Sequence, residues 1–251
     1  MATRPTYRRA VLKVSGEAFG QGQGKGLDLG CIDTIAAEIA DAHRRGVQLA
    51  VVIGGGNFIR GASLIASGVV PARADTMGML ATVINGLALH DALDRLKVAN
   101  RLQTAIPMPS VAEPYIRERC MMHLTKKRVV ILAAGTGSPH FTTDTAAALR
   151  ARELNATVLL KGTNVDAVYS DDPRTNSKAK RYTRLTYEDV LHNDLRVMDA
   201  TAVTLCRDGH IPIIVFNHAK PGNLRRALFS KRQTVGTFIG GSKHVGRRNV
   251  S

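Results

Sequence analysis

Two lysines stand within apolar segments, where an ammonium group is unexpected. Lys13 lies near the end of the segment Ala10–Val14, and Lys161 directly follows Val158–Leu160. A charge among apolar side chains is costly unless it reaches solvent or an anion. Either lysine alone could extend its ammonium group to water. Because both stand beside glycine-containing turns, we interpret the two lysines as phosphate-binding groups.

A run of three glycines, Gly54–Gly56, directly follows the apolar segment Gln48–Ile53. Without Cβ atoms the backbone can approach a phosphate closely and point its N–H groups at it. Taken alone, the run could equally be a tight turn that binds nothing. Its place directly after a predicted strand makes it a candidate phosphate turn.

A second glycine turn, Gly135–Gly137, follows the apolar segment Val129–Ala133 and leads to Thr142 and Thr143. Either threonine can cap a helix that begins near the following residue. The free N–H groups and the dipole at a helix start favour an anion. Capping and ligand binding can coexist here, so we expect a second anion site.

Asp144 and His140 belong to the same stretch and have different expected roles. Asp144 could complement the helix dipole, or it could orient the lysine ammonium groups at a reaction centre, and the sequence leaves both open. Phosphoryl transfer depends on positioning and charge neutralisation more than on proton abstraction. We therefore interpret His140 as a loop-packing residue and not as a general base.

The glycine-rich stretch Gly20–Gly26 resembles a phosphate loop only superficially. A Walker A motif has the pattern G-x-x-x-x-G-K-[ST]. Here Phe19 stands in place of the first glycine, and Gly26 stands in place of the serine or threonine. The spacing also differs from G-x-G-x-x-G. We predict a surface loop, and an ordinary P-loop nucleotide kinase is disfavoured.

The elements that must position these residues alternate between strand-like and helical patterns, which indicates a mainly parallel sheet covered by helices. The predicted strands are 10–14, 48–53, 101–106, 129–133, 158–160 and 213–216. The predicted helices are one that ends near Gly46, one over 74–96, one from about 144, and a short terminal one. Parallel strands place the glycine turns at one edge, where open α/β sheets bind ligands.

Composition excludes several classes of protein. The 251 residues are 44% hydrophobic, enough for a sizeable core, and no apolar run reaches the roughly 20 residues of a membrane helix. The segment 1–9 lacks the apolar stretch of a secretory signal. Three separated cysteines and the histidine spacing match no disulfide framework or zinc site. We expect a cytoplasmic protein with no metal-binding cluster of its own.

The net charge of +15 admits two interpretations. It could indicate nucleic-acid binding, or an enzyme whose positive field concentrates phosphates. The basic residues are scattered in pairs, and aromatic residues make up only 4% of the chain, which leaves few stacking platforms. Nucleic acid is therefore the less favoured partner.

Six blocks of the sequence, in order and over most of the chain, resemble the bacterial UMP kinases. They are Leu12–Glu17, Val52–Asn57 with Arg60 and Gly61, Asp75–Thr82, Gly135–Asp144, Asp171–Pro173 and Val197–Asp199. The K-x-S-G-E and D-x-M-G-M-L-A-T blocks are specific to this branch. Acetylglutamate kinases and aspartokinases resemble the chain in the glycine turns but not in those two blocks.

The resemblance implies the amino acid kinase fold, a three-layer αβα sandwich around a mainly parallel sheet and not a P-loop fold. It implies one domain over residues 1–239, and the basic, glycine-containing segment 240–251 is expected to be a disordered tail. The implied reaction converts MgATP and UMP into ADP and UDP in pyrimidine nucleotide biosynthesis. Mg²⁺ would bridge phosphate oxygens, held more by nucleotide and water than by the protein.

Site residues carry over position by position, as what the resemblance implies. ATP would contact Lys13, Val14, Ser15, Gly16, Gly56, Arg60, Thr163, Tyr169 and Asp172. UMP would contact Gly55, Asp75, Thr136, Gly137, Ser138, Pro139, His140, Phe141, Thr142 and Thr143. The candidate catalytic residues are Lys13, Arg60, Asp144 and Lys161.

The resemblance also implies a homohexamer that GTP activates and UTP inhibits. Arg101 and Arg128 match positions linked to GTP, whereas His90 stands where an arginine is common. One alternative is another kinase of this fold, acting on a carboxylate or on isopentenyl phosphate. The Asp75 block and the loop 136–143 argue against it. The alternative from a different class is a basic nucleic-acid-binding regulator.

Overall fold

The computed structural model describes residues 4–20, 25–173, 175–195, 197–230 and 235–241. Its centre is a nine-stranded sheet in the order β4-β3-β5-β2-β1-β6-β10-β11-β9. The strands are β1 (Arg9–Val14), β2 (Gln48–Ile53), β3 (Asn100–Thr104), β4 (Glu113–Pro114), β5 (Val129–Ala133), β6 (Val158–Thr163), β9 (Arg184–Thr186), β10 (Ile213–Asn217) and β11 (Thr237–Gly240). A separate two-stranded sheet pairs β7 (Val168–Tyr169) with β8 (Arg181–Tyr182).

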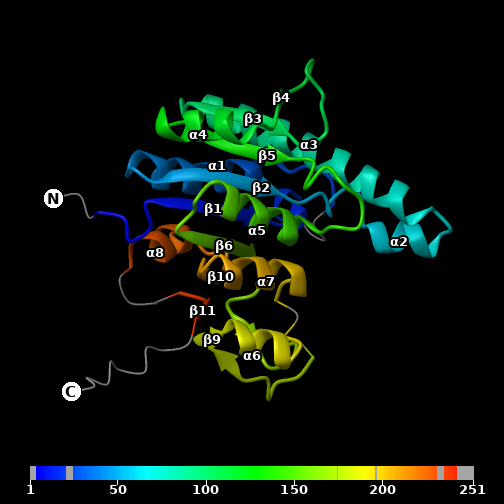
Figure 1. Ribbon diagram of the computed structural model, residues 1–251, viewed down its shortest axis with the longest axis vertical. Helices are drawn as coiled ribbons and strands as arrows, with labels where there is room; N and C mark the ends of the chain where they lie inside the picture. Colours follow the sequence, from blue (N-terminus) through cyan, green and yellow to red (C-terminus); the bar gives the residue numbers. More distant parts are fainter. Residues whose placement is uncertain (1–3, 21–24, 174, 196, 231–234, 242–251) are drawn as a thin grey trace.

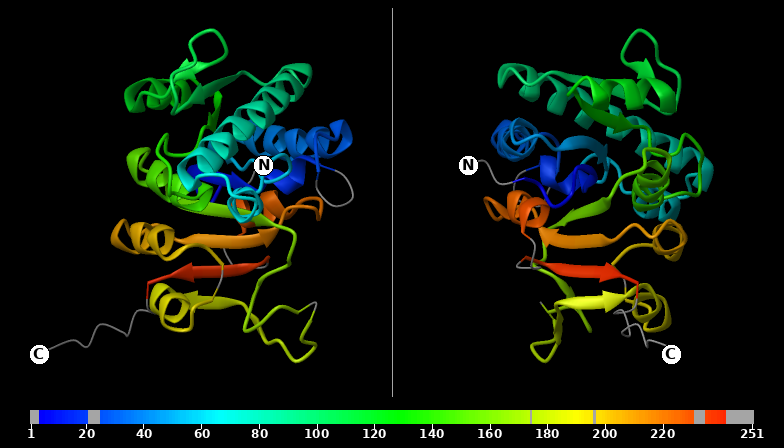
Figure 2. Two further views of the ribbon diagram at one scale, coloured as in Figure 1. Left: turned by 90° about the vertical axis from the view of Figure 1, so that its right-hand side faces the viewer. Right: turned by 60° about the vertical axis from the view of Figure 1, so that its left-hand side comes forward.

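Helices cover both faces of the large sheet (Figures 1 and 2). The α-helices are α1 (Leu29–Arg44), α2 (Gly61–Ala66), α3 (Pro71–Arg95), α4 (Arg117–Thr125), α5 (Thr143–Glu153), α6 (Tyr187–His192), α7 (Ala200–Asp208) and α8 (Asn223–Phe229), and a short 3-10 helix spans Gly16–Phe19. One core cluster packs α1, α3 and α8 against one face of the sheet. The other packs α4, α5, α6 and α7 against the opposite face. This confirms the predicted three-layer α/β architecture.

Side-chain alternation along the central strands decides which core each residue joins. In β1, Leu12 and Val14 pack in the core with α1 and α3, and Val11 packs in the core with α5. In β6, Leu160 packs in the core with α1 and α3, and Leu159 packs in the core with α5. Because side chains alternate, Lys13 in β1 and Lys161 in β6 lie on the face covered by α5.

The strands that end in glycine turns are parallel neighbours, as predicted. β1 pairs with β2 and β6, and β2 pairs with β5, all in parallel. Their carboxyl ends therefore meet at one edge of the sheet, together with Gly16, Gly54–Gly56 and Gly135–Gly137. The exception to the parallel pattern is β11, which pairs antiparallel with β10.

Several boundaries differ from the predicted ones. The strand predicted at 101–106 spans Asn100–Thr104, because the backbone bends at Ala105 and Ile106. The helix predicted over 74–96 begins at Pro71, since proline is favoured in a first helical turn. The last strand, β11, extends to Gly240, one residue into the predicted tail, whose residues 242–251 lie outside the described part.

Among the helices of the described residues, none combines the length and apolar character needed to cross a membrane. The helix predicted to stop near Gly46 ends at Arg44, and Gly46 follows with φ +91°, the left-handed conformation that glycine adopts most easily.

Candidate active site

Asp144 lies between two lysines that come from adjacent strands. Its Oδ1 is 3.0 Å from Nζ of Lys13, and its Oδ2 is 2.6 Å from Nζ of Lys161. Lys13 and Lys161 are direct partners in the pairing of β1 with β6. The structure thus brings together three of the four candidate catalytic residues, at the carboxyl edge of the sheet.

The beginning of α5 explains how Asp144 reaches this position. Thr142 is the N-cap, and its Oγ1 accepts hydrogen bonds from the backbone N–H groups of Asp144 and Thr145. Asp144 therefore sits in the first turn, where the helix dipole favours a carboxylate. It also pairs with the two ammonium groups, so its position is compatible with both roles left open by the sequence.

Burial and charge oppose each other at this cluster. Burial on its own would raise the pKa of Asp144, but the ammonium groups of Lys13 and Lys161 outweigh it and hold the pKa below its ordinary value. Burial lowers the pKa of Lys161, and Asp144 only partly offsets that effect. The cluster therefore carries one net positive charge when all three groups are ionised, and it is suited to attract an anion.

The segment after α6 contributes contacts that the sequence reasoning missed. Nζ of Lys161 also donates a hydrogen bond to the carbonyl of Val197. Asp199 accepts hydrogen bonds from Oγ1 of Thr142 at 2.5 Å and from Oγ1 of Thr145 at 2.6 Å. It also caps α7. The sequence indicates the block Val197–Asp199 as a motif. Its hydrogen-bond partners are distant in sequence, so no local pattern identifies them.

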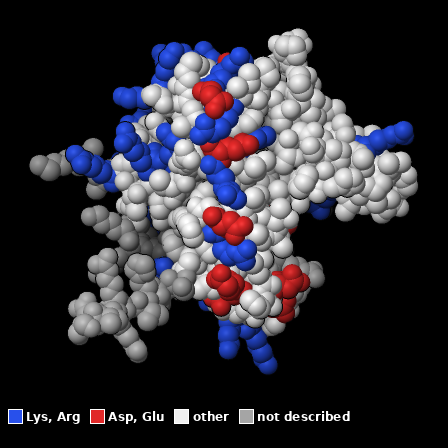
Figure 3. Space-filling view, viewed as in Figure 1, with Lys and Arg blue, Asp and Glu red and all other residues white. Residues whose placement is uncertain are grey.

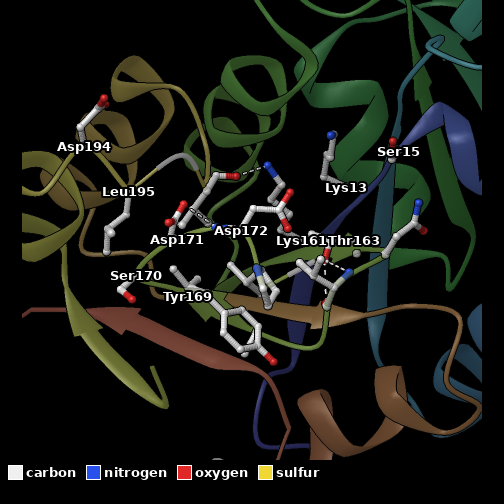
Figure 4. Close-up of a pocket in the computed structure, with 18 of the residues that line it drawn as sticks. Lys13, Ser15, Lys161, Thr163, Tyr169, Ser170, Asp171, Asp172, Asp194 and Leu195 are labelled. Carbon is white, nitrogen blue, oxygen red and sulfur yellow. Dashed lines mark hydrogen bonds between the residues drawn. The ribbon is translucent and has the colours of Figure 1, made fainter. Parts of the chain in front are cut away.

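A cavity of about 980 Å³ opens beside the cluster (Figure 4). Five of the predicted ATP contacts line it: Lys13, Ser15, Thr163, Tyr169 and Asp172. Figure 4 shows Lys13 and Ser15 at one end and Asp194 and Leu195 at the other. Its lining also includes Val165, Ala167 and Val168. A pocket lined by two lysines as well as by apolar side chains suits a nucleoside phosphate.

Four predicted ATP contacts are not among the residues that line this cavity: Val14, Gly16, Gly56 and Arg60. Val14 is buried in the core, because its side chain alternates away from that of Lys13. Arg60 lies at the surface, where its guanidinium donates to Oε1 of Glu17 at 2.6 Å. Glu17 itself lines the cavity, although the sequence indicates it only as the last residue of the block Leu12–Glu17.

The glycines pack the turns against one another and against α3. A Cβ atom on Gly16 would collide with the amide nitrogen of Gly56, and one on Gly54 would lie 2.7 Å from the amide nitrogen of Gly16. A Cβ on Gly55 would lie 2.6 Å from the carbonyl oxygen of Gly78 in α3. At least part of the need for glycine is therefore this close packing, apart from any contact with phosphate.

The predicted UMP-binding loop, residues 136–143, runs from the end of β5 to α5 along the same edge. Asp75 of α3 is beside it, and its Oδ2 accepts the backbone N–H of His140 at 2.8 Å. His140 lies in the loop with φ 69°, but its side chain is 70% exposed, so it does not pack there as predicted. Phe141 is also exposed. The structure therefore brings Asp75 together with the loop that the sequence associated with the same ligand.

Arg101 and Arg128 are not part of this site. Arg101 is in β3 near its amino end and Arg128 directly precedes β5, so both lie toward the opposite edge of the sheet. Glu113 and His123 connect them. Nε of Arg101 is 3.5 Å from Glu113, Glu113 is hydrogen-bonded to His123 at 2.9 Å, and His123 contacts Arg128 at 3.1 Å. Each arginine thus has a defined environment away from the glycine turns.

Residues 8–217 match the model of the amino acid kinase family. The structure is similar to the crystal structure of UMP kinase from Bacillus anthracis, with a TM-score of 0.90, 38% identity, and coverage of 94% of this chain and 97% of that one. For the UMP kinase from Ureaplasma parvum the TM-score is 0.87, with 35% identity and coverage of 93% and 98%. For the uridylate kinase from Archaeoglobus fulgidus the TM-score is 0.68, with 28% identity and coverage of 92% of this chain and 99% of that one.

Proposed function

The chain belongs to the amino acid kinase family and, within it, to the UMP kinases, and we propose that it transfers the terminal phosphoryl group of ATP to UMP. The products are ADP and UDP, a step of pyrimidine nucleotide biosynthesis that we assign to the cytoplasm. The observation that carries the proposal is the Lys13–Asp144–Lys161 cluster at the edge where the glycine turns meet.

Lys13 and Lys161 act on the transferred phosphoryl group. Its equatorial oxygens carry the negative charge of the transition state, and preorganised cations there lower the barrier. Asp144 holds the two ammonium groups in place before the substrates arrive, so no reorganisation is needed during the reaction. Arg60, which lies at the surface beside Glu17, supplies a further guanidinium suited to phosphate oxygens.

ATP occupies the cavity between β6, β7 and the segment before α7. Its base packs among apolar residues such as Val165, Val168 and Leu195, and its phosphates extend toward Lys13 and Ser15. The turns that contain Gly16 and Gly56 pack closely against each other, and their backbone N–H groups complete the phosphate contacts. In this arrangement the terminal phosphate reaches the lysine cluster.

UMP binds between the loop 136–143 and α3. The N-terminus of α5 and the hydroxyl of Thr143 receive its phosphate. Asp75 is acidic and thus poorly suited to contact phosphate, so it accepts hydrogen bonds from the ribose. Its Oδ2 already orients the loop through the N–H of His140, and its remaining lone pairs can serve the sugar.

Mg²⁺, when bound together with ATP, would supply neutralisation of the phosphate charge. The nearest carboxylate to the reaction centre, Asp144, has both oxygens turned to ammonium groups. Asp171 and Asp172 line the cavity and could contact the cation directly or through water. Because Mg²⁺ keeps several waters and prefers nucleotide phosphates, these residues fit a metal held mainly by ATP.

Regulation is assigned to the opposite edge of the sheet. Two guanidinium groups are suited to bidentate contacts with phosphate oxygens, and Arg101 and Arg128 are joined there through Glu113 and His123. We assign GTP, the activator implied by the family, to these arginines. UTP shares its base and sugar with UMP, and we assign its inhibition to the acceptor site.

The outer face of α3 supports a homohexamer. Met77, Leu80, Ile84 and Leu87 are between 41% and 45% exposed and follow one another at spacings of three and four residues. Figure 3 shows few charges over the region where Figure 1 places α2 and α3. An apolar stripe of this kind can pair with the same stripe of a second copy about a two-fold axis. Such dimers are the units of the proposed hexamer.

The direct test is ADP release with UMP, CMP, dUMP, acetylglutamate and aspartate as acceptors, with MgATP as the donor. We expect turnover with UMP to exceed that with every other acceptor. Preference for a carboxylate acceptor, or no turnover with any nucleoside monophosphate, would refute the proposed function.

A further inference from the structure

Helix α3 buries two polar side chains among its apolar ones. Thr82 is 1% exposed and Asn85 is 0% exposed. They are three residues apart, so they lie on the same face of the helix, which is the face turned to the sheet. Buried polar groups destabilise a core unless they are hydrogen-bonded, so the partners of these two residues identify what they contribute.

Thr82 holds the beginning of the acceptor loop. Its Oγ1 accepts the backbone N–H of Ala134 at 2.6 Å and donates to the carbonyl of Met79 at 2.7 Å. Ala134 has φ 61° and Gly135 has φ 56°, so the chain takes two successive left-handed residues directly after β5. An L-residue such as alanine is strained in that conformation. The Thr82 hydroxyl gives this strained turn a fixed hydrogen-bond partner.

Asn85 holds the other glycine turn. Its Nδ2 donates to the carbonyl of Gly54 at 2.8 Å and to Oδ1 of Asn57 at 2.7 Å. Its Oδ1 accepts from Nδ2 of Asn57 at 2.9 Å. The two buried amides are therefore paired reciprocally across the turn. Asn57 also donates to the carbonyl of Gly26, so the same pair joins a third segment to α3.

We propose that Thr82 and Asn85 are positioning residues for phosphoryl transfer, which attach the two phosphate turns to a single rigid helix at a fixed separation. The inference rests on the proposed kinase function and extends it to residues that need not touch either substrate. The tight packing of Gly55 against Gly78 brings the helix backbone itself against the turn. Thr82 and Asn85 are about one helical turn apart, so α3 sets the distance between the two glycine turns that hold the phosphate donor and the phosphate acceptor.

This arrangement predicts a specific pattern of kinetic effects. Misplacing reacting groups by about 1 Å can lower turnover on the order of 100-fold. Thr82→Val keeps the volume but removes the hydroxyl, so we expect kcat with UMP to fall at least about tenfold while KM for ATP changes little. Thr82→Ser restores the hydroxyl and should restore kcat. Asn85→Leu should lower kcat in the same way.

Val83→Ala is the matched control, because Val83 is buried in the same helix but bonds to neither turn. All variants are assayed well below their melting temperatures. Loss of kcat in Thr82→Val, with near-normal kcat in Thr82→Ser and Val83→Ala, supports the proposal. Equal activity of Thr82→Val and Val83→Ala, at equal folded fractions, overturns it.

Amide hydrogen exchange gives a readout that does not depend on the acceptor. Ala134 and the following loop should exchange faster in Thr82→Val than in the wild-type protein or in Val83→Ala. Unchanged exchange there would overturn the positioning role even if the kinase function stands. Conversely, failure of the wild-type protein to phosphorylate UMP would count against the proposed function, while the exchange result would still decide whether Thr82 fixes the turn.

Discussion

Lys13 and Lys161, 148 residues apart in sequence, are paired residues of adjacent parallel strands, and both ammonium groups contact Asp144. Two like charges on neighbouring strands would repel each other without the carboxylate between them. Asp144 offsets that repulsion and leaves one net positive charge facing the cavity. The cluster is therefore both a structural unit and a candidate anion site, and the two roles can be separated by substitution.

Lys13→Ala tests the catalytic role. The variant keeps the Lys161–Asp144 ion pair, so we expect it to remain folded. Removing one preorganised charge at such a site should lower kcat on the order of 100-fold or more. Steady-state ADP release and a thermal melt are the measurements. Lys126→Ala, an exposed lysine at the end of α4, is the control. A folded Lys13→Ala protein with near-normal turnover would show that Lys13 is not catalytic.

Asp144→Asn tests the structural role through pH. The folded-state pKa of Asp144 is depressed, so its contribution to stability is complete above the unfolded value of about 3.9 and is lost as pH falls through the folded pKa. At pH 7 the free energy of unfolding of the variant should be lower than that of the wild type by on the order of 3 kcal/mol, since a partner of a buried ion pair is removed. Urea unfolding from pH 7 downward should show this difference between the two proteins becoming smaller below about pH 4. A difference that does not change with pH would contradict the assignment.

Much of the fold could be predicted because the central strands are continuous apolar runs that end in glycine. Val129–Ala133 is an example, and its predicted and observed bounds coincide. By contrast, α4 was missed because only Cys120, His123 and Leu124 are buried among its nine residues, which is too few for a helical period. The antiparallel β11 was also missed, since it has only four residues and α8 separates it in sequence from its partner β10.

The candidate site was predictable only where chemistry and local pattern coincide. Glycine turns and strand-end lysines have a sequence signature. The role of Asp144 does not, because a dipole-stabilising and a lysine-bridging carboxylate occupy the same position in a helix. Asp199 and Asn85 were missed for a related reason: their partners, such as Thr142 and Asn57, are brought close only by the tertiary fold.

Asp75 should select the acceptor. Asp75→Asn removes the charge and one acceptor site, so we expect KM for UMP to rise on the order of tenfold while KM for ATP stays nearly constant. The measurement is the variation of initial rate with each substrate in turn. Thr76→Ala, which alters the exposed neighbour on the same helix, is the control. Equal changes in both KM values would assign Asp75 a purely structural role.

Arg101 and Arg128 should determine the response to GTP. Replacing both with alanine should leave the basal rate nearly intact and abolish activation, because the pair lies far from the glycine turns. His90 stands near this edge, hydrogen-bonded to Asn100, and in place of an arginine it should make activation weak, because an imidazole lacks the bidentate fork of a guanidinium. Rates with and without GTP test this, with Arg119→Ala as the control. Indifference of the wild-type protein to GTP would remove the basis for the site.

The outer face of α3 yields the last prediction. Its inner face buries Met79 and Val83, whereas Leu80 and Ile84 project outward, 41% and 45% exposed. Carboxylates placed on this face would be buried and unpaired at a two-fold interface, but in an isolated chain they would remain solvated. Leu80→Asp combined with Ile84→Asp should therefore split the oligomer without unfolding the chain.

Light scattering after size-exclusion chromatography measures the outcome. The control is Leu29→Asp, which introduces the same charge at an exposed apolar residue that begins α1 and is 67% exposed. We expect six copies in the wild-type protein and in the control, and a smaller particle in the double variant. If the double variant keeps the wild-type size, α3 is not the interface. If the double variant dissociates, its kcat reports how far assembly itself supports the two phosphate turns, since Thr82 and Asn85 are untouched.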